Sequence, residues 1–348
     1  MAKGENKKLL ESGDPLVVGA MSAGAVFAAV AAAVGGWIGY SALGINHRVE
    51  LPEAIEGERR TFVSPRAGMI SYYADRTASG RPLVLIHGVN AAASAYEMRP
   101  LYLHYRSQRP VYALDLPGFG FSDRSNRPYS VRLYSDAIID FLESQVKNGP
   151  ADVVALSLSS EFAARVALER PDLVHSLTLI SPSGFAERGN EKGIAQRTSS
   201  KNNSDRLYAA LAFPLWRQAI YDLLATPTSV KYFLQQSFVG AVDRGLIDYD
   251  YRTAHQPGAR YAPLYFVSGK LFSPDIREEV YEKLSLPVLV VFDRDNFVRL
   301  DMLPDVVRNH ENWKAVRIAP TKGLPQWEKL DETAQALDSF WSERVNAS

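Results

Sequence analysis

Residues 152–171, DVVALSLSSEFAARVALERP, contain three local signals in succession. A short apolar run over 153–156 is typical of a buried strand, small residues follow around Ser157, and the remaining residues have the apolar spacing of an amphipathic helix. A strand, a sharp turn and a helix in this order display a serine at the end of a strand, provided that the flanking residues are small. Ala155 and Ser159 meet that condition. The segment therefore raises the question of whether Ser157 is a nucleophile or the remnant of one.

Strand-like and helix-like stretches alternate on both sides of this segment. The alternation covers residues 60–183 and resumes over 284–348, and it predicts an α/β fold with a mostly parallel sheet and helices on both faces. Between residues 184 and 283 the pattern changes to stretches with helical spacing. We expect this interruption to form a helical cap over the sheet.

Composition excludes several classes of function. Acidic and basic residues balance at 39 each in 348 residues, and no basic stripe occurs, so we expect no nucleic-acid partner. The chain has no cysteine, which excludes disulfides and thiolate chemistry. Neither a metal-ligand cluster nor a phosphate-binding glycine loop is present, so we expect no metal and no cofactor.

The N-terminal region differs from the rest of the chain. Residues 15–46 carry no charge, and about 20 apolar residues suffice to cross a bilayer. We predict a tail over residues 1–15, one transmembrane helix over 16–43 and a linker over 44–59. A cleaved signal peptide and a buried Ala-rich helix are the alternatives.

Charges and small residues near this helix indicate its orientation and its partners. Lys3, Lys7 and Lys8 precede it and only Arg48 follows closely, which places the N-terminus in the cytoplasm and the main domain on the opposite side. Small residues recur at a spacing of four, which lets helices approach closely in a membrane. We therefore expect the membrane, and other membrane proteins, as partners. The small-residue pairs are Gly19/Ala23, Gly24/Ala28, Ala32/Gly36 and Gly35/Gly39.

Four motifs resemble those of the α/β-hydrolase superfamily in their order along the chain. They are LVLIHG at 83–88, LDLPGFGFSD at 114–123, ALSLSS at 155–160 and VLVVFDRD at 288–295. The resemblance implies that Ser157 is the nucleophile and Asp295 the triad acid. It also implies that the backbone N–H groups of Val89 and Leu158 form the oxyanion hole.

The resemblance fails at the third triad member. Relatives typically read G-H-x-P-x-x-E after the last strand, whereas this chain reads KGLPQWEKL at 322–330, with Gly323 at the histidine position. No histidine follows His310. Two others are possible substitute bases, His87 near the oxyanion loop and His255 in the cap, and we expect both to be structural instead.

Two functions follow. The first is a catalytically degenerate hydrolase fold that binds an apolar small molecule or a partner protein, or has a structural role in a membrane complex. The second is a working serine hydrolase of esterase or lipase type that acts on apolar acyl esters and has a relocated base. A haloalkane- or epoxide-type enzyme would need a carboxylate nucleophile, and Ser157 excludes it. The missing base favours the first function, because a serine hydroxyl is a poor nucleophile without one.

Overall fold

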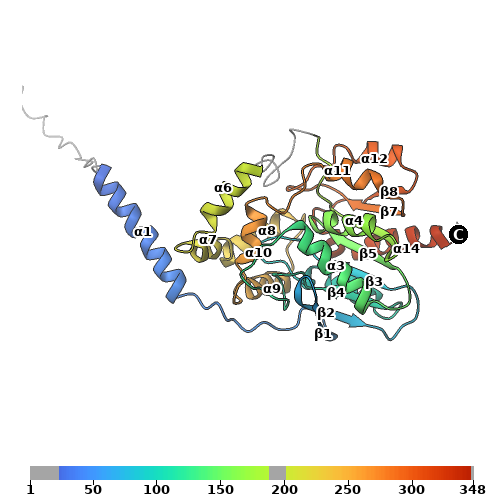
Figure 1. The fold of residues 1–348 in the computed structure, drawn as a ribbon, viewed down its shortest axis with the longest axis horizontal. Coiled ribbons are helices and arrows are strands. Elements are labelled where there is room, and N and C mark those ends of the chain that lie inside the picture. The colour runs from blue at the N-terminus through green and yellow to red at the C-terminus, as the bar shows by residue number, and fades with distance from the viewer. Residues whose placement is uncertain (1–22, 188–200, 346–348) are drawn as a thin grey trace, which may run out of the picture.

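The computed structural model describes residues 23–187 and 201–345. Figure 1 shows a sheet with helices packed around it and one long helix, α1 (Ala23–Leu43), that extends away from this body. The sheet contains eight strands in the order β1-β2-β4-β3-β5-β6-β7-β8 within the described chain. Only the pairs β1–β2 and β2–β4 are antiparallel, and this confirms the predicted, mostly parallel sheet. The strands are β1 (Glu58–Ser64), β2 (Gly68–Asp75), β3 (Leu83–Ile86), β4 (Val111–Leu114), β5 (Ala151–Leu156), β6 (Val174–Ile180), β7 (Val288–Phe292) and β8 (Trp313–Arg317).

Apolar side chains cover both faces of the sheet, and the strand periodicity of two sorts them. Val84 and Ile86 of β3 belong to one hydrophobic cluster, and Leu83 and Leu85 belong to the other. Helices α3 (Val131–Gln145), α4 (Ser159–Glu169) and α12 (Leu303–Asn309) contribute to the first cluster. The 3-10 helix η1 (Ala95–Met98) and helices α2 (Arg99–Tyr105) and α14 (Leu330–Val345) contribute to the second. Helices on both faces were predicted from the strand–helix alternation, and they are confirmed.

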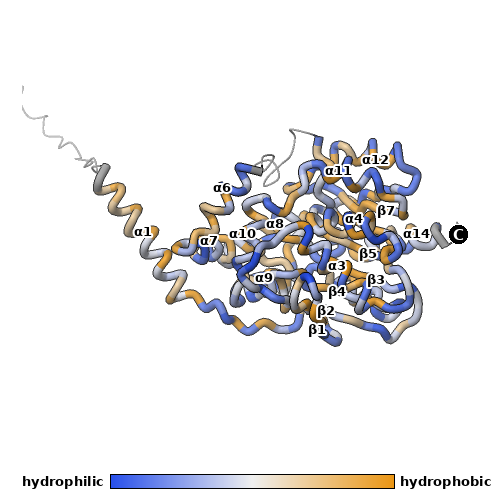
Figure 2. Tube along the Cα trace, viewed as in Figure 1, coloured by the Kyte–Doolittle hydropathy of each residue, from blue (hydrophilic) through white to orange (hydrophobic). Residues whose placement is uncertain are grey.

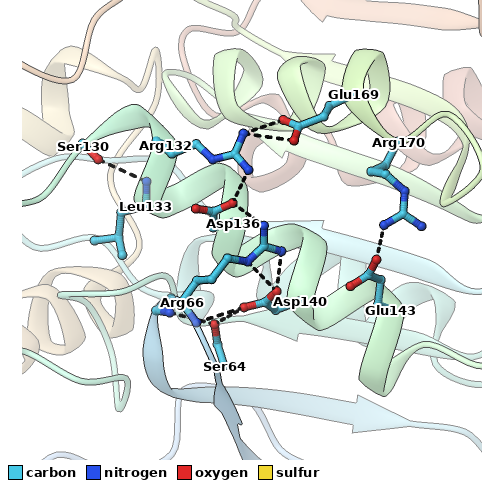
Figure 3. Close-up of polar contacts among 11 residues, drawn as sticks. Ser64, Arg66, Ser130, Arg132, Leu133, Asp136, Asp140, Glu143, Glu169 and Arg170 are labelled. Atoms are coloured by element: carbon cyan, nitrogen blue, oxygen red, sulfur yellow. Dashed lines mark hydrogen bonds and ion pairs between the residues drawn. The ribbon is translucent and has the colours of Figure 1, made fainter.

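Ion pairs connect the turn between β1 and β2 to the first helical face (Figure 3). Arg66 of this turn bonds Asp140 of α3, with 2.9 Å between Nε and Oδ1, and its Nη1 lies 2.5 Å from Asp136 Oδ1. Arg132 of α3 lies 2.8 Å from Glu169 at the end of α4. Most of these groups are at least partly exposed, so each pair contributes little on its own. Together they fix the antiparallel edge of the sheet against α3 and α4.

Every described element between β6 and β7 is helical, and we call residues 184–283 the helical insertion. The insertion contacts two loops at the carboxyl edge of the sheet: Tyr221 Oη donates to Ala91 O at 2.8 Å, and Asn296 Nδ2 donates to Gln236 O at 3.1 Å. Its outer bounds stay a prediction, and residues 188–200 lie outside the described chain. Its elements are α6 (Lys201–Leu211), α7 (Arg217–Leu224), α8 (Pro227–Gln236), α9 (Arg244–Ala254), α10 (Tyr261–Val267), α11 (Ile276–Glu279) and η2 (Tyr281–Lys283).

Helix α1 is the candidate membrane span. Residues 25–43 are the only described helical stretch with the length and apolar composition that a bilayer crossing needs. A signal sequence or a buried core helix would have the same two properties, although almost none of α1 is buried. Residues 16–22 of the predicted span, and the predicted tail, lie outside the described residues.

Candidate active site

Ser157 lies on a tight turn between β5 and α4. Strand β5 ends at Leu156 and α4 begins at Ser159, so only two residues connect them. The backbone of Ser157 has φ = +54°, a left-handed conformation that costs a non-glycine residue on the order of 1–3 kcal/mol. The surrounding backbone holds it there, since Ser157 N–H donates to Ile180 O at 2.8 Å and Ser160 N–H donates to Ser157 O at 3.1 Å. The structure therefore has the strand, turn and helix that the sequence predicts.

Ser159 replaces the usual glycine after the serine without disrupting this turn. Its side chain is fully buried, and Oγ donates to the carbonyl of His87 at 2.6 Å. This bond connects the start of α4 to the loop that follows β3. The departure from the family pattern at position 159 therefore gives a stabilising contact between helix α4 and the loop after β3.

Val89, in the loop after β3, and Leu158, at the start of α4, are the two residues predicted to form the oxyanion hole. Val89 and Leu158 are both buried, and their backbone N–H groups make no hydrogen bond within the described residues. Both groups are thus available for a ligand oxygen, which is what an oxyanion hole requires. The structure is compatible with the roles that the resemblance gives to these two residues.

Glu97 supports this loop, and sequence reasoning missed it. Its two carboxylate oxygens accept hydrogen bonds at 2.7 Å from Gly88 N–H and from the side chain of Asn90. Burial raises the pKa of Glu97 to about 7, although these two hydrogen bonds oppose the increase. The spacing of Glu97 from His87 carries no motif, so the fold was needed to find it.

Asp295 and Gly323 lie side by side at the carboxyl edge of the sheet. A Cβ atom built on Gly323 would be 3.0 Å from Asp295 Oδ2. The other oxygen, Oδ1, accepts hydrogen bonds from Phe297 N–H at 2.6 Å and Val298 N–H at 3.1 Å. Asp293 is bonded instead to Arg317. The structure thus brings the expected acid next to the expected histidine position, where this chain has no side chain.

The expected gap beside Gly323 is not open space. Ser237, which follows α8, is close enough that its Cβ would be 3.4 Å from a Cβ at position 323. The same segment is bonded to α13 (Pro325–Glu328), because the N–H groups of Val239 and Gly240 donate to Glu328 Oε1 at 2.7 and 3.0 Å. The helical insertion therefore covers position 323, which sequence reasoning did not predict.

His87 is engaged in structural hydrogen bonds. The ring is fully buried, with Nδ1 at 2.6 Å from Gly88 O and Nε2 accepting from Leu116 N–H at 2.9 Å. Burial lowers the pKa of His87 to about 4. Because both ring nitrogens are occupied by the backbone, His87 is not positioned to accept a proton from Ser157. This agrees with the expected structural role.

His255 belongs to a different group of residues. Its Nδ1 lies 2.7 Å from Tyr251 O, and its ring is stacked on that of His47 with centroids 6.2 Å apart. Burial lowers the pKa of His255. All six histidines are among the described residues, and no hydrogen bond joins an imidazole nitrogen to Ser157 Oγ in this part of the chain. Among the described residues, no cluster of three or more His, Asp or Glu side chains could hold a metal ion.

Comparison with known proteins supports the resemblance. A family model described as "Alpha/beta hydrolase family" matches residues 83–336. Among curated proteins, pimeloyl-acyl-carrier-protein methyl ester esterase of Aeromonas salmonicida is 29% identical over 229 residues, which cover 65% of this chain and 81% of the esterase. The uncharacterised hydrolase YugF of Bacillus subtilis is 32% identical over 141 residues, which cover 40% of this chain and 49% of that protein.

Solved structures show the same fold at lower sequence identity. A putative lipase from Acinetobacter baumannii has a TM-score of 0.67 at 16% identity, and the match covers 92% of this chain and 97% of the lipase. A membrane phospholipase A has a TM-score of 0.65 at 21% identity, covering 92% of this chain and 96% of the phospholipase. At these identities the likeness establishes the architecture alone.

Proposed function

Because the chain belongs to the alpha/beta hydrolase family, we propose that it is a membrane-anchored, catalytically degenerate member that binds an apolar ligand or has a structural role in a membrane complex. One observation carries this proposal: Gly323 occupies the histidine position directly beside Asp295. In well-studied serine hydrolases, loss of the base costs on the order of 10⁶ in turnover. The serine, the acid and the oxyanion hole then remain without a group to take the proton.

The surroundings of the other histidines support the same proposal. His87 has both ring nitrogens bonded by backbone groups, and His255 is paired with Tyr251 and His47. His175 lies at the amino end of β6, whereas Ser157 follows the carboxyl end of β5. The two strands are parallel, so roughly 15–20 Å of strand length separates these residues.

The retained groups suit a binding function. The N–H groups of Val89 and Leu158 can hold one oxygen of a carboxylate or ester, and the Ser157 hydroxyl can donate to the other. Apolar residues of the helical insertion would then enclose the acyl part of the ligand, as in most small-molecule sites. One relative is named as a methyl ester esterase, which supports an acyl compound as the ligand class.

An active serine hydrolase of esterase or lipase type is the alternative. Its support is the left-handed backbone of Ser157, which is retained at a cost in strain, together with the two available N–H groups. Such an enzyme would cleave an ester of an apolar acyl group. It needs a base that the observed arrangement does not supply, and His255 would have to leave Tyr251 to provide one.

The membrane part of the proposal rests on α1. Its exposed apolar surface supports a single span, and the N-terminal lysines support a cytoplasmic N-terminus with the main domain on the opposite side. The small residues of α1 are the proposed contact with other membrane proteins. Retention of the full-length chain in the membrane fraction after high-salt and alkaline washes tests the anchor, and release into the supernatant would overturn it.

Ligand binding and ester hydrolysis can be compared in one pair of proteins. Wild type and Ser157→Ala should both bind a fluorescent fatty acid such as parinaric acid, with Kd values within about threefold, because the apolar enclosure dominates binding. Neither should hydrolyse p-nitrophenyl esters above the uncatalysed rate. Turnover by the wild type that Ser157→Ala abolishes would establish the alternative function.

A further inference from the structure

The last turns of α1 are fixed to helix α7 of the insertion. Trp37 Nε1 donates to Ala219 O at 2.8 Å, and Ser41 Oγ donates to Asp222 Oδ2 at 2.6 Å. His47, just after α1, places Nε2 3.0 Å from both carboxylate oxygens of Asp222. Ala219 and Asp222 are three residues apart, so they share one face of α7. That face is therefore the docking face for α1, and Figure 1 shows the two helices in contact.

Large apolar side chains are exposed on the neighbouring face of α7 and in the turn before it. We call four of these residues the apolar edge: Phe213, Leu215, Trp216 and Leu223, which are 48%, 63%, 36% and 50% exposed. The rings of Phe213 and Trp216 contact each other, with centroids 4.5 Å apart. Apolar surface of this kind is more stable when it is removed from water. Their concentration in one short segment indicates a surface that is covered in use.

Helical geometry places the apolar edge beside the docking face. Trp216 and Leu223 are seven residues apart and project in nearly the same direction. At about 100° per residue, this direction lies roughly 80° around the axis from the centre of the docking face. The apolar edge and α1 are therefore adjacent on one side of the insertion. In Figure 2, α1 is coloured predominantly as hydrophobic up to the level at which it meets α7.

The position of Trp37 sets the depth of this surface relative to a membrane. The proposed transmembrane helix begins at residue 16, and its described part begins at Ala23. In that proposal the 21 residues before Trp37 would span about 30 Å, the thickness of the hydrocarbon core. Trp37 would then lie at the membrane–water interface, where tryptophan is enriched. Helix α7, which accepts the Trp37 hydrogen bond, must lie at the same level.

We propose that the apolar edge of α7 inserts into the interfacial region of the lipid bilayer beside α1. This proposal rests on the proposed membrane anchor and adds a second, independent contact with lipid. The occupant is the bilayer and not a second copy of the chain, because the edge lies on the helix that holds α1, and the apolar side chains of α1 from Val26 to Val34 are themselves exposed. The contact holds the helical insertion against the surface from which an apolar ligand would enter the site.

The absence of cysteine allows a direct test in the full-length protein. Single variants Leu215→Cys, Val30→Cys and Val63→Cys carry an environment-sensitive fluorophore and are reconstituted into phosphatidylcholine–phosphatidylglycerol vesicles. Val30 lies in α1 and is 56% exposed, and Val63 lies on the edge strand β1 and is 78% exposed. Quenching is measured with spin-labelled lipid and with aqueous iodide, and thermal unfolding checks that each variant folds like the wild type.

The label at 215 should be quenched by spin-labelled lipid about twofold or more over the label at 63 and be protected from iodide. A label at 215 that behaves like the one at 63, while the label at 30 is quenched by lipid, overturns this proposal alone. Protection from both quenchers with energy transfer between copies also overturns it, since a second copy then covers the edge. If the label at 30 is not quenched by lipid either, the proposed membrane anchor is also overturned. The label at 30 therefore distinguishes failure of the anchor from failure of the apolar-edge proposal.

Discussion

A Cβ atom on residue 323 would lie 3.0 Å from Oδ2 of Asp295, so Gly323 and Asp295 are direct neighbours. In a Ser-His-Asp site, the acid orients the imidazole that takes the proton from serine. Asp295, the predicted acid, accepts hydrogen bonds from the backbone N–H groups of Phe297 and Val298. The position predicted for the histidine carries no side chain, while Ser157 has a left-handed backbone.

Restoring the histidine should restore part of the chemistry. Gly323→His alone places a side chain against Ser237, so we combine it with Ser237→Gly to make room. The double variant should hydrolyse p-nitrophenyl acetate roughly tenfold or more above wild type, which is a small part of the ~10⁶ that a well-placed base provides. Stopped-flow or plate absorbance of p-nitrophenolate measures this.

Two controls accompany the double variant. Ser237→Gly alone should show no gain, and adding Ser157→Ala to the double variant should abolish the gain. A folded double variant with no gain would contradict the idea that serine, acid and oxyanion groups remain preorganised.

The strained backbone of Ser157 implies that a glycine at this position should stabilise the protein. Ser157 has φ = +54°, which glycine adopts without a steric penalty, so Ser157→Gly should raise the unfolding free energy by about 0.5–1 kcal/mol. Thermal or denaturant unfolding measures the change. Ser122→Gly is a contrasting control, because Ser122 is buried, does not have a positive φ and uses its hydroxyl in two hydrogen bonds, so this change should destabilise. Loss of stability in Ser157→Gly would show that the turn is not strained.

The buried carboxyl group of Glu161 should make the free energy of unfolding depend on pH. This buried carboxyl accepts hydrogen bonds from Ser183 Oγ, just before the helical insertion, and from Ser273 N–H within it, and burial raises its pKa from about 4.5 to about 7. Between these values the native state holds a proton that the unfolded state has released. The contribution of this bound proton to the free energy of unfolding is fully present below about pH 4.5 and is lost as the pH rises through about 7.

Glu161→Gln tests this dependence, because the amide keeps one acceptor for Ser273 and can donate to Ser183. The stability of the variant relative to wild type should rise by on the order of 2 kcal/mol between pH 4.5 and 7.5. Glu97 titrates over the same range in both proteins and cancels in the comparison. Equal pH profiles for the two proteins would contradict the raised pKa.

Replacing Asp222 should weaken the contact between α1 and the helical insertion. It is 1% exposed and accepts hydrogen bonds from Ser41, His47 and Gln218. Asp222→Ala leaves these three groups without their partner and should cost about 2–4 kcal/mol. Limited proteolysis within residues 44–57 should become faster. Asp248→Ala, which removes a carboxylate that is 60% exposed, is the matched control and should change little. Equal proteolysis rates for the two variants would show that Asp222 does not secure α1.

Local patterns predicted the sheet, because apolar runs such as 288–292 and the turn at Ser157 depend on neighbouring residues in the sequence. The pairing of Asp295 with position 323 also followed, since both residues come after parallel strands that end at the same edge. Glu97, Glu161 and Ser237 were not predictable in this way. Their roles arise from contacts between segments far apart in the sequence, and no local periodicity marks them.

The reactivity of Ser157 toward a serine-directed fluorophosphonate tests the central claim most directly. Without a base the hydroxyl is a poor nucleophile, so the wild-type protein should remain unlabelled over a time in which an active serine hydrolase is labelled completely. In-gel fluorescence or intact-mass spectrometry measures the labelled fraction. Labelling at a rate comparable to that of the active hydrolase, and its loss in Ser157→Ala, would contradict the degenerate function and establish that a base acts on Ser157.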